Sequence, residues 1–224
     1  MVDTPDTAAA DRARPRGGLG RFSPPDWAFL PGAAVVFAGL VMLALSYDPV
    51  GEDPVVTETE FVMAGPALAQ LVPGPGTGFQ LMTTGAAPVA RATATASFEA
   101  AGRLSAGLAA VIPPAFEARV IGRLIKLEAT VRAAPDSGIT EARMAYFTAS
   151  KGASGWRPIA VSEAFETVGF CFSVPAAAEP NGAEYFGLWP DIRGANRGLL
   201  IQEIRVTIQP EGAREGECEA GLRG

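Results

Sequence analysis

The chain has 224 residues, a formal net charge of -6 and no histidine. The acidic balance argues against a nucleic-acid-binding protein, which needs a concentrated basic surface. The missing histidine excludes Ser-His-Asp and Cys-His catalysis and the commonest zinc sites. Basic residues are almost all arginine, with lysine only at Lys126 and Lys151, and alanine, glycine and proline are abundant. This composition is typical of a GC-rich bacterial genome.

The N-terminal quarter of the chain predicts a tail followed by a membrane anchor. Residues 1–25 have no periodicity and are rich in Ala, Arg, Asp, Pro and Gly, which predicts a disordered tail. The segment 26–47 holds an uncharged apolar run, WAFLPGAAVVFAGLVMLALSY, with Trp27 and Tyr47 at its ends. Some twenty residues reach about 30 Å as a helix, the thickness of a bilayer core, and the two rings suit the headgroup region. We therefore predict a single-pass transmembrane helix.

Basic residues close to this segment predict its orientation. Four arginines precede it: Arg12, Arg14, Arg16 and Arg21. After it, no Lys or Arg occurs before Arg91. The positive-inside rule places the N-terminus in the cytoplasm and the C-terminal part in the periplasm, with the helix in the bacterial inner membrane. A cleaved signal peptide is the alternative, because residues 44–46 (ALS) resemble a cleavage site.

Small residues recur four apart within the predicted helix, at Ala28 and Gly32 and at Ala34 and Ala38. This spacing lets a second helix approach closely. We interpret these four residues as a helix-packing face, which would meet other subunits of a membrane protein complex.

The rest of the chain predicts a mainly β fold. Residues 48–54 (DPVGEDP) form a linker of turn-forming residues. Alternating apolar and polar runs separated by Gly/Pro turns then predict strands at 55–63, 67–72, 79–84, 90–98, 104–112, 124–133, 142–149, 156–162, 165–174, 185–189 and 199–208. Residues 113–122 open with proline and predict helical turns. Residues 55–209 are therefore expected to form an antiparallel β-sandwich, and residues 210–224 a flexible tail.

The alternation predicts which side chains of two long strands face the core. Leu200, Ile204, Val206 and Ile208 are expected inward, and Glu203, Arg205 and Thr207 outward. The outward charges of the predicted strands are Lys126, Glu128, Arg132, Glu166, Glu203 and Arg205. If the strands adjoin, opposite charges pair across the sheet. The alternative is a polar face that meets another protein or a glycan.

From residue 124 onward the strand order resembles that of jelly-roll carbohydrate-binding modules and galactose-binding-like domains. The resemblance rests on LIKLEATVRA, RMAYFTAS, GWRPIAV, FCFSVP, EYFGLWPD and LLIQEIRVTI. It implies a sheet face or rim loop that holds sugar through aromatic and polar contacts. The ligand-binding candidates are then Trp156, Tyr185, Trp189, Asp191, Arg193 and Arg197. The alternative is that Trp156 and Trp189 are ordinary core or edge aromatics.

The remaining chemistry-bearing residues leave several points open. Structural calcium in such domains would draw on Glu58, Glu60 and Glu203, but no Asp/Asn-rich loop supports it, so we expect no cofactor and no metal. Cys171 and Cys218 would face an oxidising compartment, either bridged or free. A hydrolase that uses a pair of carboxylates is disfavoured. Glu166 is the one candidate for a catalytic acid, and the sequence offers no second carboxylate to pair with it.

Two functions follow from these expectations. The first is a membrane-anchored, non-catalytic periplasmic domain that binds envelope polysaccharide. The second is an assembly subunit of a membrane complex, which docks through its helix and its sandwich. Exposed tryptophan rings would favour the first function, and buried rings the second.

Overall fold

The computed structural model describes residues 52–84, 87–102, 105–135, 137–148, 152–176 and 182–222. The chain divides into two units, Met1–Pro49 and Val50–Gly224, and every described residue belongs to the second. The predicted tail, the predicted transmembrane helix and the helix-packing residues therefore lie outside the described residues. Within the described ranges, no helix is long and apolar enough to cross a membrane.

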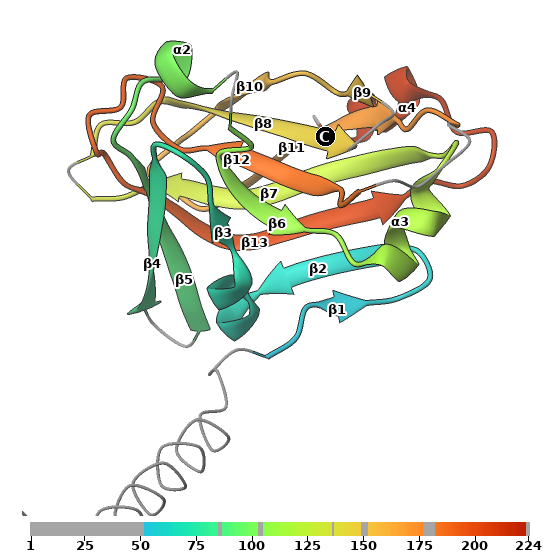
Figure 1. Ribbon diagram of the computed structural model, residues 1–224, viewed down its shortest axis with the longest axis horizontal. Helices are drawn as coiled ribbons and strands as arrows, with labels where there is room; N and C mark the ends of the chain where they lie inside the picture. The colour runs from blue at the N-terminus through green and yellow to red at the C-terminus, as the bar shows by residue number, and fades with distance from the viewer. Residues whose placement is uncertain are drawn as a thin grey trace, which may run out of the picture. The chain divides into compact units, whose positions relative to one another are not determined.

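Two antiparallel sheets face each other across the core (Figure 1). The seven-stranded sheet contains β1 (Val55–Val56), β2 (Glu60–Ala64), β4 (Thr77–Thr84), β5 (Ala87–Ala94), β7 (Leu124–Ala133), β11 (Glu166–Ser173) and β13 (Leu199–Ile208). The six-stranded sheet contains β3 (Val72–Pro73), β6 (Leu108–Val111), β8 (Glu141–Thr148), β9 (Gly152–Ala153), β10 (Arg157–Ala160) and β12 (Tyr185–Trp189). The predicted antiparallel β-sandwich is confirmed.

Among the described residues, four short helices lie between or after the strands: η1 (Gly65–Gln70), α2 (Phe98–Ala101), α3 (Pro114–Val120) and α4 (Glu215–Gly221). The helical turns predicted at 113–122 correspond to α3. The strand predicted at 67–72 is wrong, because η1 occupies most of this segment. Pro66 stands near the start of η1, where its missing backbone N–H costs little.

Strand β13 organises the seven-stranded sheet. Along one edge it pairs with the whole of β7. Along the other edge it pairs first with β5, at residues 199–201, and then with β2, at residues 203–207. Inward side chains from both sheets form one contiguous core, in which Phe61, Leu127, Phe186 and Ile204 are fully buried. The long alternating strands thus bury one face and leave the other polar.

A β-bulge in β13 changes which side chains face the core. Ile201 pairs with Val131 and Glu203 with Thr130, so one extra residue is inserted in β13. After the bulge, Ile204 points inward as predicted. Before the bulge, the alternation of inward and outward side chains is shifted by one residue from the predicted one. Ile201 therefore lies in the main core. Leu200, which the sequence placed there, lies in a small separate cluster.

The single strand predicted at 55–63 is two strands, because a tight turn separates β1 from β2. The Thr57 hydroxyl oxygen accepts a hydrogen bond from the Glu60 backbone N–H at 2.9 Å. This local bond closes the turn in place of continued extended structure.

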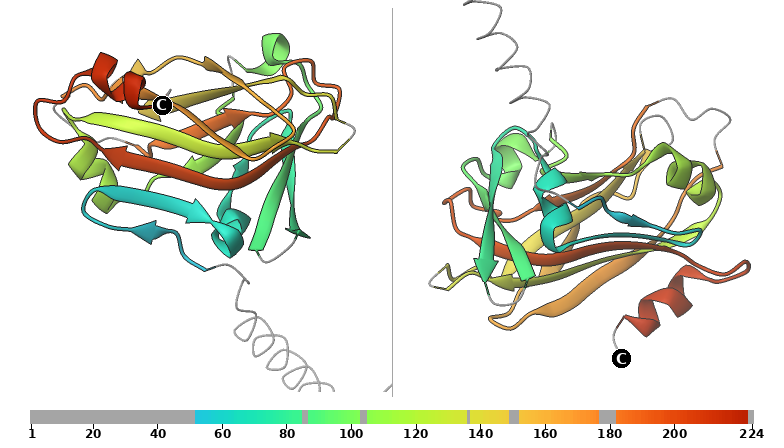
Figure 2. Two further views of the ribbon diagram at one scale, coloured as in Figure 1. Left: turned by 180° about the vertical axis from the view of Figure 1, so that it is seen from behind. Right: turned by 90° about the horizontal axis from the view of Figure 1, so that it is seen from below.

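The flexible tail predicted from residue 210 is also corrected. Helix α4 lies against β11, and a disulfide joins Cys171 of β11 to Cys218 of α4 (Figure 2). The Cα atoms of the two cysteines are 6.2 Å apart. No residue of α4 is fully buried, and the disulfide attaches it covalently to the sandwich, beside an ion pair between Glu215 of α4 and Arg157 at 3.8 Å. The disulfide also resolves the open question about the cysteines.

A polar cluster is buried at one end of the sandwich. The Tyr146 hydroxyl donates to Glu184 Oε2 at 2.5 Å, and the Glu184 backbone N–H donates to Glu117 Oε1 at 2.7 Å. All three residues are buried. Burial, and then the hydrogen bond to Glu184, raise the pKa of Tyr146 far above its usual value. The tyrosine therefore stays neutral and acts as a donor that connects β8 to the segment before β12.

Candidate functional site

The outer face of the seven-stranded sheet carries a row of polar and charged side chains. In β7 the side chains of Ile125, Leu127 and Ala129 are buried, and those of Lys126 and Glu128 point outward. This alternation follows from the period of two in an extended strand. The same rule orients β13, whose register sets Arg205 opposite Glu128 and Thr207 opposite Lys126.

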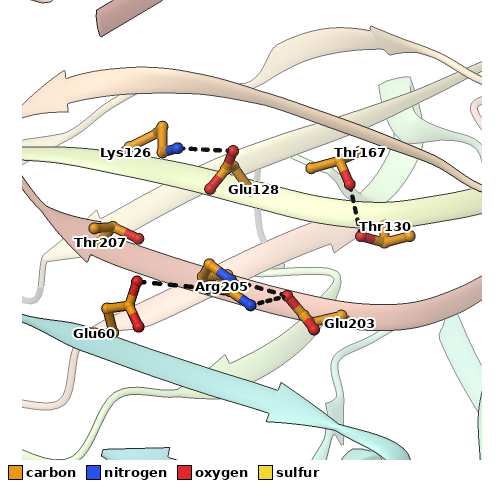
Figure 3. A pocket seen from close by; sticks show the side chains of 8 residues that line it. All are labelled: Glu60, Lys126, Glu128, Thr130, Thr167, Glu203, Arg205 and Thr207. Carbon is orange, nitrogen blue, oxygen red and sulfur yellow. Dashed lines mark hydrogen bonds and ion pairs between the residues drawn. The ribbon is translucent and has the colours of Figure 1, made fainter. Parts of the chain in front are cut away.

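These outward side chains, with their neighbours on β2 and β11, line a hollow of about 350 Å³, which we call the polar groove (Figure 3). The groove is lined by Glu60, Lys126, Glu128, Thr130, Thr167, Glu203, Arg205 and Thr207. It crosses four strands, β2, β13, β7 and β11. Because these strands are hydrogen-bonded neighbours, the register of the sheet fixes the backbone position from which each of these side chains extends.

Arg205 stands at the centre of the charges in the groove. Its guanidinium donates to Glu203 Oε1 from Nε at 2.9 Å and lies 2.8 Å from the same oxygen through Nη2. Its Nη1 lies 3.5 Å from Glu60 Oε1. The hydrogen bond to Glu203 raises the pKa of Arg205, although burial works against it. Arg205 therefore holds two carboxylates in place from one side of the groove.

The other side of the groove holds one more ion pair and a pair of hydroxyls. Lys126 Nζ lies 3.0 Å from Glu128 Oε1. The hydroxyl oxygens of Thr130 and Thr167 are 2.9 Å apart across β7 and β11. Thr207 Oγ1 is enclosed and has no hydrogen-bond partner among the described residues. Opposite charges on this face are therefore paired, but Lys126–Glu128 and Arg205–Glu203 lie within one strand each. Of the ion pairs that the structure describes in the groove, Arg205–Glu60 is the one that crosses between strands, as expected, and its Glu60 was not among the charges expected on this face.

The groove can recognise a ligand only through hydrogen bonds and charge. Three carboxylates and two cations give it a net charge of -1, and no aromatic side chain is among the described residues that line it. Carboxylates accept, Lys and Arg donate, and threonine does both. A ligand with many hydroxyl groups matches such a lining, since each hydroxyl also donates and accepts.

The tryptophans predicted to bind sugar pack inside the protein. The Trp156 and Trp189 rings contact each other edge to face, with centroids 6.3 Å apart, and both contact Phe98. Trp189 has no exposed surface, and its indole N–H donates to the Asp191 carbonyl oxygen at 3.1 Å. Trp156 is half-buried and donates to the Gly102 carbonyl oxygen at 3.0 Å. Trp189 thus fits the alternative of a core aromatic and has no surface to offer a ligand, whereas a ligand role for Trp156 stays a prediction.

Asp191 organises the loop that follows β12. Its side chain is fully buried and accepts hydrogen bonds from the backbone N–H groups of Arg193, Ala195 and Arg197. The Arg197 guanidinium lies 2.6 Å from Asp191 Oδ1 and also donates to the Gly138 carbonyl oxygen at 3.2 Å. Burial alone would raise the pKa of Asp191, but the bonds from Arg197, Arg193 and Ala195 together hold it below its usual value. Asp191 and Arg197 are committed to the loop.

Tyr185 and Arg193 do not meet at one site. Tyr185 is the first residue of β12 and is half-buried, while Arg193 follows the end of this strand and is exposed. The four steps along β12 alone separate its ends by about 13 Å. The six predicted ligand-binding residues therefore form no shared surface, and a ligand role for Tyr185 and Arg193 stays a prediction.

The carboxylates considered for calcium have other neighbours. Glu60 and Glu203 lie in the polar groove on either side of Arg205, and Glu58 is exposed in the turn between β1 and β2. Within the described ranges, no group of three or more Asp, Glu, Cys or His side chains is placed to hold a metal ion. A cation beside Arg205 would face its positive charge, so these residues do not fit a calcium site.

Four groove residues belong to the outward charges that the sequence singled out: Lys126, Glu128, Glu203 and Arg205. Arg132 and Glu166 from the same set do not line it. Thr130, Thr167 and Thr207 were missed as site residues, although Thr130 shares the outward phase of β7 with Lys126. The same alternation, extended from charged residues to hydroxyls, would have found it.

No family model matches the chain, and no curated protein matches its sequence. Among solved structures, the CBM22-1 xylan-binding domain of Paenibacillus barcinonensis Xyn10C has 9% identity and a TM-score of 0.44, covering 70% of this chain and 96% of that one. The family 11 module of Lic26A-Cel5E from Clostridium thermocellum has 9% identity and a TM-score of 0.38, covering 75% and 100%. A CBM4 structure has 10% identity and a TM-score of 0.38, covering 73% and 96%. These neighbours are carbohydrate-binding modules with a β-sandwich, the class that the sequence resembles. Similarity at TM-scores below 0.5 does not indicate which ligand a chain binds.

Proposed function

We propose that residues 50–224 form a non-catalytic domain that binds a polysaccharide in the polar groove. The domain is held at the bacterial inner membrane by the predicted helix and works on its periplasmic side. The observation that carries this proposal is the groove itself, in which carboxylates, cations and hydroxyls from four adjacent strands are arrayed on one rigid sheet.

The charge of the groove indicates which polysaccharides suit it. With a net charge of -1, it disfavours strongly anionic chains and suits neutral or amino-bearing ones. The ion pairs on Arg205 and Lys126 hold the side chains in place before a ligand arrives, so less side-chain freedom is lost on binding. Without an aromatic platform, hydrogen bonds to sugar hydroxyls supply the contacts, and we expect weak, salt-tolerant binding.

The disulfide supports the proposed location. Disulfides persist in oxidising compartments such as the bacterial periplasm and are rare in the cytosol. Cys171 and Cys218 are bridged, in agreement with the topology that the four N-terminal arginines predict.

Affinity gel electrophoresis tests the proposal. Residues 50–224 migrate through gels that contain a series of neutral, amino-bearing and anionic envelope polysaccharides. We expect retardation by a neutral or amino-bearing chain, and retardation by none of the series would contradict the proposal.

A second function, as an assembly subunit of a membrane complex, is favoured by one observation. Trp189 is buried and Trp156 is half-buried within an aromatic cluster, which is the arrangement expected of a scaffold. Purification of the full chain in mild detergent, followed by mass spectrometry, tests it. Stoichiometric partner subunits would support this function, and a lone monomer would count against it.

A further inference from the structure

The far end of the β4–β5 hairpin projects from the sandwich. β13 pairs with β5 only at residues 90–92 and then pairs with β2, so the hairpin beyond Ala90 lacks a neighbouring strand on that edge. Leu81 and Met82 are each 39% exposed, although adjacent strand residues point to opposite faces. Side chains on both faces of the hairpin are therefore exposed to solvent at this level.

The start of the domain lies on the same side and is also apolar. Val55 and Val56 of the edge strand β1 are 61% and 40% exposed. The helix η1 lies against β5, and its Gln70 side chain donates to Asp53 Oδ1 at 3.1 Å. These contacts place η1 next to both the hairpin and the first described residues. Figures 1 and 2 show β1, η1 and the hairpin on the same side of the domain.

The length of chain before the domain limits how far this surface can lie from a membrane. The predicted helix ends at Tyr47, and only six residue steps separate Tyr47 from Asp53. Fully extended, six residues span at most about 22 Å. Because Gln70 ties Asp53 to η1, the linker cannot lengthen without breaking that bond. A linker of this length allows the side of the domain that carries the hairpin to reach the bilayer in which the helix is predicted.

We propose that this apolar surface, formed by Val55, Val56, Leu81 and Met82, docks on the lipid bilayer and inserts the side chains of Leu81 and Met82 into the interfacial region. The proposal rests on the membrane anchor of the proposed function and is independent of polysaccharide binding. Apolar side chains gain by leaving water at the boundary of headgroups and acyl chains. Glu52 and Asp53 are exposed beside the surface and disfavour anionic headgroups, so the lipid is zwitterionic.

Docking fixes the orientation of the domain relative to the membrane. A tether alone would let the sandwich rotate freely above the bilayer. With Leu81 and Met82 inserted, the seven-stranded sheet and its polar groove keep a constant direction, which suits a domain that holds a polysaccharide near the membrane.

Depth-dependent quenching tests the proposal on the full chain in phosphatidylcholine nanodiscs. Met82→Cys carries an environment-sensitive fluorophore, and Ala153→Cys, on the exposed strand β9 at the opposite side of the domain, is the matched control. The two native cysteines are bridged and do not react with the label. We expect lipids with a nitroxide near the headgroup end of the acyl chain to quench the Met82 label at least about threefold more than the Ala153 label.

Two further measurements separate the outcomes. Co-elution of the chain with nanodiscs reports the membrane anchor, so failure to co-elute counts against the anchor and against docking together. With co-elution but equal quenching at both positions, docking is refuted while the anchor stands. Leu81→Glu in the Met82→Cys background should reduce the quenching to the control level. Unchanged quenching, or quenching replaced by cross-linking between two copies at Met82, would show that lipid is not what covers the hairpin.

Discussion

Replacing Asp191 by alanine should destabilise the domain strongly, because it removes the acceptor on which the loop after β12 depends. Asp191 is fully buried and accepts from three backbone N–H groups and from the Arg197 guanidinium. Removing one partner of a buried ion pair, so that the other charge is left unpaired, costs about 3–5 kcal/mol. Since the Arg197 side chain is 27% exposed, water can solvate part of its charge in the variant. We therefore expect a loss of about 3 kcal/mol in the free energy of unfolding.

Urea unfolding of residues 50–224, followed by tryptophan fluorescence, measures this loss, because Trp189 lies beside the loop and is buried. Arg193→Ala is the matched control. Only the backbone of Arg193 bonds to Asp191, and its side chain is exposed, so we expect a change within about 0.5 kcal/mol. Equal midpoints for Asp191→Ala and Arg193→Ala would refute the role given to the carboxylate.

The pH dependence provides a second test of the same residue. The pKa of Asp191 is lower in the folded protein than its usual value. A carboxylate with a lowered pKa stabilises the fold above its unfolded-state pKa, and this stability is lost as the pH falls through the folded-state pKa. The difference between the wild type and Asp191→Ala should therefore be full at neutral pH and shrink in acid. A constant difference would contradict the assignment.

Two further perturbations test the attachment of α4 and the buried polar cluster. Cys218→Ser opens a loop of 47 residues, so by chain entropy the free energy of unfolding should fall by up to about 4 kcal/mol. Reduction of the disulfide in the wild type should give the same loss. Urea midpoints equal to that of the oxidised wild type would contradict this role of the disulfide. Tyr146→Phe removes the donor to Glu184 and should cost about 2 kcal/mol, whereas a thermal melt that matches the wild type would show that this bond is dispensable.

The bounds of three strands were predictable because β7, and β13 beyond its bulge, alternate between buried and exposed side chains, while β12 is a short apolar run that ends at a turn. The bounds expected for β7, β12 and β13 agree with the structure. The phase of β13 before Glu203 was not predictable, because the bulge depends on a change of partner strand from β5 to β2. The turn at Thr57 and the helix η1 depend on local bonds and on proline, which compete with an apolar pattern that also suits a strand.

The polar groove was partly predictable, since alternation alone places Lys126, Glu128, Glu203 and Arg205 outward. The neighbouring position of these residues depends on the long-range pairing of β7 with β13. The sequence left the position of Trp189 open for a similar reason. A tryptophan at the end of a strand has the same local pattern whether it is exposed or covered, and its cover comes from Phe98 and Trp156 in distant segments.

The role of the polar groove is tested most directly by the affinity of residues 50–224 for the polysaccharide that retards them most in gels. Isothermal titration calorimetry compares the wild type with Arg205→Gln, in the groove, and Arg193→Gln, outside it. A lost hydrogen bond to a charged group is worth about 1.5–3 kcal/mol, so Arg205→Gln should weaken binding at least about tenfold. Arg193→Gln should bind like the wild type. Unchanged affinity in Arg205→Gln would contradict the groove as the binding site, and weakened binding in Arg193→Gln would place the site at the loop after β12 instead.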